Sequence, residues 1–445
     1  MNRNRDTFVE RVRQDGIEQV RVIFLDYNGI PRARSVAIGS LPAVLQRGVN
    51  FSSPTVDFNS RDLFPPRAAF DLASPDVWAV PDATTYRLAP GASNTGEMLA
   101  DLVDADGQPW AGCPRTALRR LTARAAEMGL VFQVGFEPEG YILRHEDDGP
   151  ALIAPPQFAT LDGLDTEPEF TSELLSYLAA VGIEVTQWSE EYGPGQIEVN
   201  LRHGAAPGAT DDLVTFRHAF RAIARKHGLL GTFMPKPFGD HAGSGLHVHL
   251  SAVSAQDSNT NLFDDPHDAE YGLAQVARHI LGGLLRHGAA LTALGATTVN
   301  SYKRFFPGSW APTHIVWSYA SRAAFIRIPE RQTARRLELR IGDPACNPYI
   351  YLAGILTAAL DGLENEIDPG SPTSGDVGAR GGGSGEIPVP HTLERALEAL
   401  ERDHVIRVGI GALILDELIK VKRSEWDTFV AHVGAWDREW YLGRY

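Results

Sequence analysis

Residues 135–143 read GFEPEGYIL, and this stretch decides how the centre of the chain folds. Its apolar residues predict a strand, and Glu137 and Glu139 stand two positions apart within it. Successive side chains of a strand point to opposite faces, so these two carboxylates share one face. A single pair of this kind usually belongs to the solvent-exposed face of a sheet, so its meaning depends on what the other strands carry.

The same spacing of two polar groups recurs in three other strand-like runs. If the four strands belong to one sheet, their polar side chains line the floor of one pocket. Glu190 precedes the second run by a short Gly-Pro-Gly turn and can join that floor. The further pairs are Gln196 and Glu198 in GPGQIEVNL, His247 and His249 in GSGLHVHLS, and Glu338 and Arg340 in RRLELRIGD.

Five converging carboxylates would repel one another unless cations lay between them. Divalent Mg²⁺ and Mn²⁺ take carboxylate oxygens and accept an imidazole. Five carboxylates and one histidine supply two ions with about three protein ligands each, a typical arrangement for phosphoryl transfer. Guanidinium groups suit phosphate and carboxylate ligands, and five arginines follow in the sequence: Arg304, Arg322, Arg327, Arg336 and Arg340.

Each piece taken alone has a simpler interpretation. His247 and His249 would more often be surface or core-edge histidines, and Arg327 or Arg336 a surface ion pair of little energetic value. The joint occurrence in apolar, glycine-rich contexts favours a site. No phosphate-binding G-x-x-x-x-G-K-[ST] loop and no G-x-S-x-G nucleophile motif is present.

Composition excludes several classes of protein. The 445 residues include 41 Lys+Arg and 56 Asp+Glu, a net charge of −15, whereas nucleic-acid binders usually carry a basic surplus. No apolar run is long enough for a membrane span, and the polar N-terminus lacks the core of a signal peptide. Only Cys113 and Cys346 are present, which fits a cytoplasmic protein without disulfides.

The pattern of elements predicts two domains. Residues 20–38 predict a β-hairpin that turns at Asn28-Gly29, and 77–80 a further strand. A boundary near residue 110 gives a β-rich domain over 1–110 and a larger one over 111–445. The larger part predicts helices at 115–128, 170–181, 213–226, 271–294, 349–366, 392–402, 404–419 and 422–432, strands at 131–143, 232–237, 245–251, 325–328 and 336–341, and a loop at 369–390.

The chain resembles the glutamine synthetase superfamily nearly from end to end. The resemblance implies an α+β fold, with an N-terminal β-grasp domain and a large catalytic domain of antiparallel sheet and surrounding helices. It also implies a homo-oligomer, commonly two stacked hexameric rings with active sites between neighbours. The segments that carry it include GFEPEGYIL, EEYGPGQIEVNL, GTFMPKPFGDHAGSGLHVHLS, NSYKRFFPGSWAP, SRAAFIRIP, RRLELRIGDPACNPYIYLAGILTAALDGL and the C-terminal KRSEWDTFVAHVGAWDREWYLGRY.

The resemblance also implies roles for single residues. One Mg²⁺ or Mn²⁺ ion would be held by Glu139, Glu190 and Glu198. A second would be held by Glu137, His247 and Glu338. Glutamate would be bound by Gly243, Arg304, Arg340 and Glu139, nucleotide by His249, Ser251, Arg327 and Arg336, and the transferring phosphoryl group by Arg322.

The implied reaction is attack of the glutamate γ-carboxylate on ATP, which gives γ-glutamyl phosphate, followed by attack of an amine. Two departures concern the amine. Trp310 stands in the flap PGSWAP where ammonia-using enzymes carry a glutamate, and Ser52 stands where they carry an aspartate. Asp57 is nearby but shifted, whereas Asp76 matches a family acid near the amine site.

An ammonium site needs a negative cage because burying an unpaired cation is costly. We therefore expect a ligase that joins glutamate to a primary amine other than ammonia. Trp310 would contact the amine, with a structural flap anchor as the alternative role. Glutamine synthetase proper is the second candidate, and a non-catalytic ring protein is a distant third. The loop at 369–390 has no tyrosine, which argues against control by adenylylation.

Overall fold

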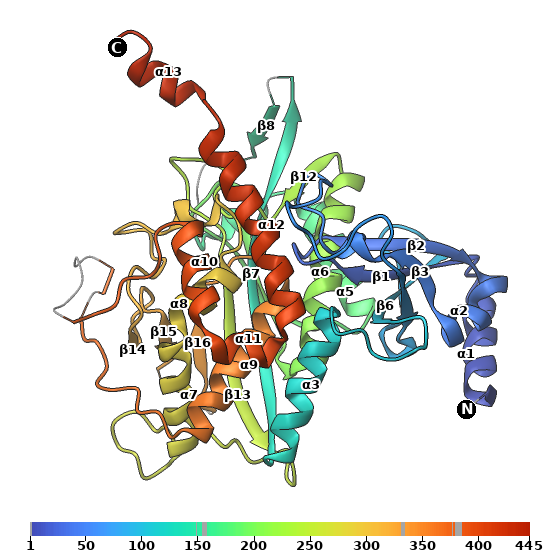
Figure 1. Cartoon of the computed structure of the whole chain (residues 1–445), viewed down its shortest axis with the longest axis horizontal. Helices are drawn as coiled ribbons and strands as arrows, with labels where there is room; N and C mark the ends of the chain where they lie inside the picture. Colours follow the sequence, from blue (N-terminus) through green and yellow to red (C-terminus); the bar gives the residue numbers. More distant parts are fainter. Residues whose placement is uncertain (1, 148, 154–157, 331–333, 376, 379–384) are drawn as a thin grey trace.

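The N-terminal sheet begins with the predicted hairpin. The computed structural model describes residues 2–147, 149–153, 158–330, 334–375, 377–378 and 385–445. The sheet has the order β2-β1-β6-β4-β3, with β5 beside β6, and β1 and β6 run parallel (Figure 1). Its strands are β1 (Gln19–Leu25), β2 (Pro31–Ala37), β3 (Val49–Ser52), β4 (Asp76–Pro81), β5 (Arg87–Leu88) and β6 (Thr95–Val103), with helices α1 (Asn2–Gln14) and α2 (Leu41–Arg47).

The turn of the hairpin packs on the larger, C-terminal part of the chain. Gly29 has φ +74°, and a Cβ there would lie 2.7 Å from the carbonyl oxygen of Cys346, so glycine is required. The next residue along, Asn347, donates from Nδ2 to the carbonyl oxygen of Asp26 at 2.7 Å. Its Oδ1 accepts from the backbone N–H of Tyr349 and caps the following helix. One asparagine thus joins a helix start to the hairpin.

The larger part of the molecule is built around a ten-stranded sheet. Its order is β14-β15-β16-β13-β7-β10-β9, with β8, β11 and β12 paired to the long β7 (Figure 1). Neighbouring strands are antiparallel except β14 and β15. The strands are β7 (Leu130–Glu146), β8 (Gly149–Leu152), β9 (Val185–Glu190), β10 (Gln196–Leu201), β11 (Gly204–Ala205), β12 (Leu229–Thr232), β13 (Leu246–Ser254), β14 (Trp317–Tyr319), β15 (Ile326–Ile328) and β16 (Leu337–Leu339).

Helices pack around this sheet, with α9 among the most buried of them (Figure 1). In the described part of the chain, no helix combines the length and apolar character needed to span a membrane. The helices are α3 (Pro114–Glu127), α4 (Leu161–Leu164), α5 (Pro168–Ala180), α6 (Ala206–Lys226), α7 (Gln275–Arg286), α8 (Gly288–Gly295), α9 (Pro348–Glu364), α10 (Leu393–Arg402), α11 (His404–Ile410), α12 (Ala412–Ala431) and α13 (Ala435–Tyr441).

Four predicted elements differ from the structure, and one of them, the helix expected over 422–432, is the second part of α12 (Ala412–Ala431) and no separate helix. The helix expected over 271–294 starts only at Gln275 and breaks at His287, whose ring bridges two aspartates. The strand expected over 232–237 is wrong: β12 ends at Thr232, because the prolines at 235 and 237 cannot donate to a ladder. The helix expected over 404–419 breaks at Gly411, which has φ +121°. The run Gly381-Gly382-Gly383 of the expected loop lies outside the described residues.

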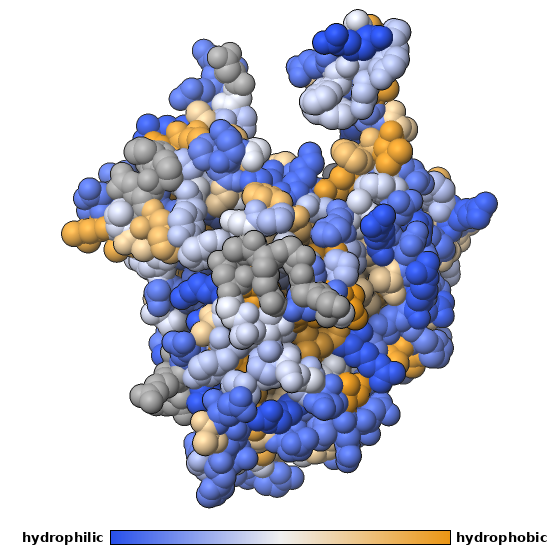
Figure 2. Space-filling view, turned by 90° about the vertical axis from the view of Figure 1, so that its left-hand side faces the viewer, coloured by the Kyte–Doolittle hydropathy of each residue, from blue (hydrophilic) through white to orange (hydrophobic). Residues whose placement is uncertain are grey.

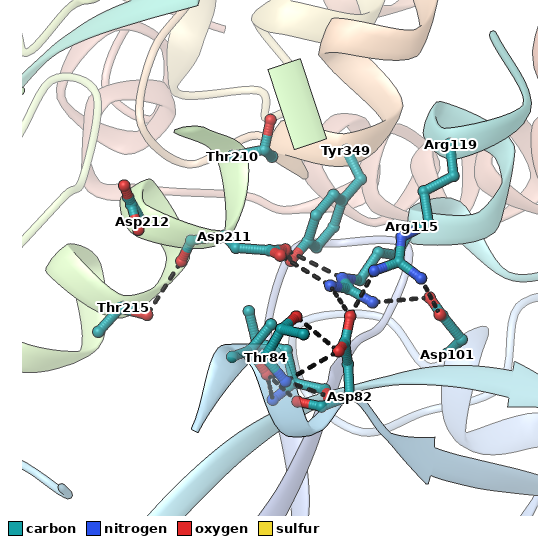
Figure 3. A network of polar contacts seen from close by, with 12 residues as sticks. Asp82, Thr84, Asp101, Arg115, Arg119, Thr210, Asp211, Asp212, Thr215 and Tyr349 are labelled. Carbon is teal, nitrogen blue, oxygen red and sulfur yellow. Dashed lines mark hydrogen bonds and ion pairs between the residues drawn. The ribbon is translucent and has the colours of Figure 1, made fainter. Parts of the chain in front are cut away.

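A buried ion network joins the N-terminal part of the chain to helices that pack on the ten-stranded sheet (Figure 3). Arg115, on α3, donates to Asp82 and Asp101 of the N-terminal part at 2.9 and 3.0 Å. It also donates to Asp211 of α6 at 2.7 and 3.0 Å, and the Tyr349 hydroxyl donates to the same carboxylate at 2.6 Å. Arg115 is 4 % exposed, so its charge is compensated by carboxylates and hardly by water.

The C-terminal segment stands away from the body of the molecule (Figures 1 and 2). Helix α13 has no buried residue. Trp436, Trp440 and Leu442 are 56 %, 60 % and 75 % exposed, which is unusual for large apolar side chains.

Candidate active site

The four predicted pairs meet on neighbouring strands of the large sheet. β13 lies between β16 and β7, and β7 lies between β13 and β10. The register confirms that the pairs come together: His247 lies opposite Glu137, Glu139 opposite Glu198, and His249 opposite Glu338.

Glu137 is the centre of this cluster. Its Oε1 atom lies 2.8 Å from His249 Nε2, and its Oε2 atom lies 3.2 Å from His247 Nδ1. Asn200 on β10 donates to Oε1 at 2.6 Å. The described residues include two groups whose possible ligand atoms all lie within 4.8 Å of one another: Glu137, His249 and Glu338, and Glu137, Glu198 and His247.

The electrostatics of the cluster fit divalent cations. Burial, together with the charges of Glu137 and Glu139, raises the pKa of Glu198 to about 9. Carboxylates that repel one another in this way are relieved by a cation among them. Carboxylate and imidazole donors also match Mg²⁺ and Mn²⁺. The chain therefore has carboxylate and histidine groups suited to divalent metal.

Glu338 is held differently, by arginines. Arg327 NH1 donates to its Oε2 at 2.5 Å, and Arg340 donates to its Oε1. Burial alone would raise the pKa of Glu338, but the charge of Arg340, with smaller contributions from the neighbouring histidines and Arg327, holds it at about 2. Glu338 is 1 % exposed and ionised, so its carboxylate is kept negative by its own ion pairs.

The prediction that Glu190 joins the pocket floor is wrong. Glu190 lies opposite Ile197 on β10, so its side chain is on the face away from Glu198. Glu191 follows it, and its N–H donates to the Gln196 carbonyl, which places Glu191 on the Glu198 face. Burial and the charge of Glu139 raise the pKa of Glu191 to about 7. The acid that approaches the cluster from this turn is Glu191.

A cavity of about 510 Å³ opens beside the carboxylates. Its volume is within the range of small-molecule sites, about 300–1,000 Å³. All four residues predicted to bind glutamate line it, together with Arg322 and Trp310. Its lining includes Glu139, Glu191, Gln196, Glu198, Gly243, His247, Arg304, Trp310, Arg322 and Arg340, and also the apolar side chains Phe158, Tyr192 and Phe306.

Backbone and side-chain contacts hold the cavity wall in place. Gln196 Nε2 donates to Glu139 Oε2 at 3.0 Å and to the Gly243 carbonyl at 3.1 Å. The N–H of Gly245 donates to the same Glu139 oxygen at 2.8 Å. A Cβ at Gly243 would lie 2.7 Å from Arg304 Cγ, so only glycine at position 243 lets the backbone approach that arginine so closely.

The residues predicted to bind nucleotide lie on the β13 side of the cluster. His249 and Ser251 follow His247 at alternate positions of β13 and so share its face. Arg336 donates from Nε to His249 Nδ1 at 2.9 Å, and Arg327 donates from Nε to the Ala320 carbonyl at 3.1 Å. None of these four residues lines the 510 Å³ cavity.

Acids of the N-terminal sheet do not reach the cavity within one chain. Asp76 is exposed, lies opposite Ser52, and accepts from Asn50 Nδ2 at 2.8 Å. Asp57 is fully buried, and the charge of Glu417 adds to burial in raising its pKa to about 7. Asp57 is therefore too buried to serve as an amine-site acid, whereas Asp76 is accessible on the surface.

Sequence reasoning missed several side chains of the cavity, among them Glu191, Tyr192 and Phe158. Gln196 shares the face of Glu198, and a hairpin with a four-residue turn pairs Gln196 with Glu191, which would have identified Glu191. Tyr192 belongs to that turn. Phe158 offered no signal, because it stands in an irregular segment and reaches the cavity only through the tertiary fold.

Comparison with known proteins agrees with this geometry. The glutamine synthetase catalytic-domain family matches residues 111–441. A glutamine synthetase of Halobacterium salinarum is 32 % identical over 99 % of this chain and 97 % of its own length. One from Thermus thermophilus is 31 % identical over 98 % of each chain.

Solved structures resemble the whole chain. A GmaS/ADP complex superposes with a TM-score of 0.90 at 32 % identity, covering 98 % of this chain and 99 % of that one. A structure described as a novel glutamine synthase homolog has a TM-score of 0.83 at 27 % identity, covering 95 % and 96 %. The chain belongs to the glutamine synthetase family and is an ATP-dependent carbon–nitrogen ligase.

Proposed function

We propose that this protein activates the γ-carboxylate of glutamate with ATP and joins it to a primary amine other than ammonia. One observation carries the proposal: the residues expected to bind glutamate and Trp310 line the same cavity. The residues expected to bind glutamate still include the arginines Arg304 and Arg340. The flap, in contrast, presents an indole where ammonia-using enzymes have a carboxylate. The activated acid therefore stays the same, and the amine differs.

The glutamate is held by Arg304 and Arg340. Arg304 is 5 % exposed and Arg340 is 6 % exposed, so both guanidinium groups act in a poorly hydrated environment, where pairing with a carboxylate is strong. Arg304 NH1 donates to the Ile341 carbonyl at 3.3 Å, which orients its other nitrogens towards the cavity. The backbone of Gly243 completes this end.

The metal ligands are proposed from the carboxylates and histidines of the cluster. We assign one ion to Glu139, Glu191 and Glu198, with Glu191 in the place first expected for Glu190. We assign a second ion to Glu137, His247 and Glu338. The possible ligand atoms of Glu137 and Glu338 lie within 4.8 Å of those of His249, which is close enough to share the ion, whereas His247 is grouped in this way with Glu137 and Glu198. Bound Mg²⁺ or Mn²⁺ would neutralise phosphate charge during phosphoryl transfer.

The nucleotide occupies the β13 side, where His249, Ser251, Arg327 and Arg336 provide polar groups. Arg322 is exposed at the cavity edge. Its guanidinium can contact and stabilise the phosphoryl group while that group is transferred from ATP to the glutamate γ-carboxylate. Attack by the amine on γ-glutamyl phosphate then forms the amide and releases phosphate.

The working form is a homo-oligomer, with two stacked hexameric rings as the expected assembly. Aromatic side chains of the C-terminal segment are exposed in the single chain, and contact with a second copy would bury them. Asp76, exposed on the N-terminal sheet, can reach a neighbouring copy's amine site. Both cysteines are buried free thiols, as expected for a protein of the reducing cytoplasm.

Glutamine synthetase proper remains the second candidate, because the curated relatives carry that name. ADP release with glutamate, ATP and a panel of amines separates the two. The panel contains ammonia, ethylamine, ethanolamine, aniline and putrescine. We expect an organic amine to give the highest kcat/KM. A highest value with ammonia would make the protein a glutamine synthetase.

Exchange of the flap residue tests the same idea from within the protein. Trp310→Glu restores a carboxylate in the flap, and we expect kcat/KM to shift towards ammonia relative to the organic amines. Trp310→Gln is the matched control, because it removes the indole without adding charge. An amine profile unchanged in both variants would place Trp310 outside the amine site.

A further inference from the structure

Three aromatic side chains from distant parts of the sequence form one surface of the cavity, here called the aromatic wall: Phe158, Tyr192 and Trp310. The rings of Phe158 and Tyr192 are stacked, with centroids 4.1 Å apart and an interplanar angle of 7°. Trp310 meets Tyr192 edge to face, with centroids 5.2 Å apart. The rings contact one another, so no ligand fits between them, and a ligand must lie along their common surface.

The wall is open on the cavity side. Phe158, Tyr192 and Trp310 are 42 %, 43 % and 49 % exposed, although each is a large apolar side chain. A contiguous exposed aromatic patch beside polar ligand-binding groups marks a binding surface rather than core. The exposed surface of the aromatic wall is therefore available to cover an apolar group of a ligand.

The backbone holds the two ends of the wall in position. Trp310 adopts φ +61°, a left-handed conformation that is unfavourable for a bulky residue. The preceding flap turn is closed by the N–H of Ser309, which donates to the Phe306 carbonyl at 3.1 Å. Tyr192 directly follows Glu191, so the wall begins where the carboxylate cluster ends.

The geometry points to the class of amine: a monoamine with an apolar alkyl or aryl group. This inference rests on the proposed function. The amine nitrogen would lie on the Glu191 side, near the activated γ-carboxyl group, and its apolar group would lie along the aromatic wall. Ammonia, about the size of a water molecule, would leave the wall uncovered.

The charges beside the wall disfavour a second ammonium group. Lys236 lines the same cavity, and its Nζ lies 5.5 Å from the centre of the Phe306 ring. Asp240 also lines the cavity, but its side chain is 85 % exposed and interacts mainly with water. A diamine would place its second charge near Lys236 and apolar rings, without a buried carboxylate as partner.

Steady-state kinetics with the full-length protein, glutamate and Mg-ATP test the inference. The substrates are methylamine, ethylamine, propylamine and butylamine, with benzylamine as an aryl member. We expect kcat/KM to rise up to about fourfold for each added CH₂, the value for complete burial of a methylene. Putrescine, which is butylamine with a second amine, should be at least tenfold poorer than butylamine.

Substitutions in the wall locate the effect. Phe158→Ala and Tyr192→Ala should each lower the ratio of kcat/KM for butylamine to that for methylamine at least fivefold. Leu161→Ala is the matched control, because Leu161 is 76 % exposed on α4, three positions from Phe158, and does not line the cavity. Tyr192→Phe keeps the ring and should preserve the ratio, which separates loss of apolar surface from misfolding.

The outcomes distinguish this inference from the proposed function. A highest kcat/KM with ammonia overturns the proposed function and the inference with it. If an organic amine is preferred but kcat/KM does not rise with chain length, or putrescine matches butylamine, only the inference is overturned. An unchanged butylamine-to-methylamine ratio in both alanine variants would likewise exclude the aromatic wall as the amine surface.

Discussion

Glu198 and Glu139 lie directly opposite each other on β10 and β7, with both side chains on the face that lines the cavity. Burial, together with the charges of Glu137 and Glu139, disfavours the ionisation of Glu198. A divalent cation bound beside Glu198 would relieve this repulsion.

This relationship predicts that metal binding releases protons. Because burial and neighbouring carboxylates raise the pKa of Glu198 to about 9, the metal-free protein carries a proton there at pH 7.5. A divalent ion must displace it. Titration calorimetry with Mn²⁺ in two buffers of different ionisation enthalpy should show release of about one proton. Glu198→Gln should abolish the release, and equal heats in both buffers for the unsubstituted protein would contradict the assignment.

The strand register predicts opposite outcomes for two adjacent acids. Glu191→Gln should lower kcat/KM about 10- to 100-fold or weaken metal binding to that extent, because it removes a group facing the cavity. Glu190 lies on the opposite face of the sheet, where its Oε1 accepts from the Gly195 N–H at 3.3 Å. Glu190→Gln keeps the size of this side chain and an oxygen that can accept the same hydrogen bond. Its activity should stay within about threefold. A larger loss for Glu190→Gln than for Glu191→Gln would mean that the register is wrong.

His287 predicts a pH dependence of stability. Its Nδ1 lies 2.6 Å from Asp403 and its Nε2 lies 3.0 Å from Asp361. Burial lowers the pKa of His287, but the hydrogen bonds to Asp403 and Asp361 outweigh it and raise the pKa above 6.5. The stabilisation is therefore complete below about pH 6.5 and disappears as the pH rises through the folded-state pKa.

Thermal unfolding at several pH values checks this prediction. The Tm difference between the unsubstituted protein and His287→Gln should be largest near pH 6 and should shrink by pH 9. The comparison cancels contributions of other titrating groups, since both proteins share them. A difference that grows with pH would show that His287 is neutral in the folded protein.

The ion network around Arg115 predicts a graded loss of stability. Arg115→Gln leaves the buried Asp211 without its cation and should cost about 3–5 kcal/mol in the free energy of unfolding. Arg119, which pairs with Asp82 and Asp101 but is 41 % exposed, is the control (Figure 3). Arg119→Gln should cost about 1 kcal/mol or less. Denaturant unfolding measures both, and equal losses would refute the role of burial.

Much of the site could be predicted from residues close in sequence. Pairs two positions apart share a strand face, so Glu137 with Glu139 and His247 with His249 identified a polar surface before any fold was known. The strand pairs came together because strand alternation is a local property of the backbone. Trp310 and the arginines Arg304 and Arg340 followed from the family resemblance, and all three line the cavity.

Tertiary structure decided the rest. The choice between Glu190 and Glu191 depends on which residue of β9 lies opposite β10, and a shift of one position moves a side chain to the other face. The aromatic wall unites residues 158, 192 and 310, which no local pattern connects. The sequence by itself determined that carboxylates and histidines share strand faces, because they repeat at alternate positions within single strands. Only the packing of distant loops decided which aromatic side chains line the cavity beside them.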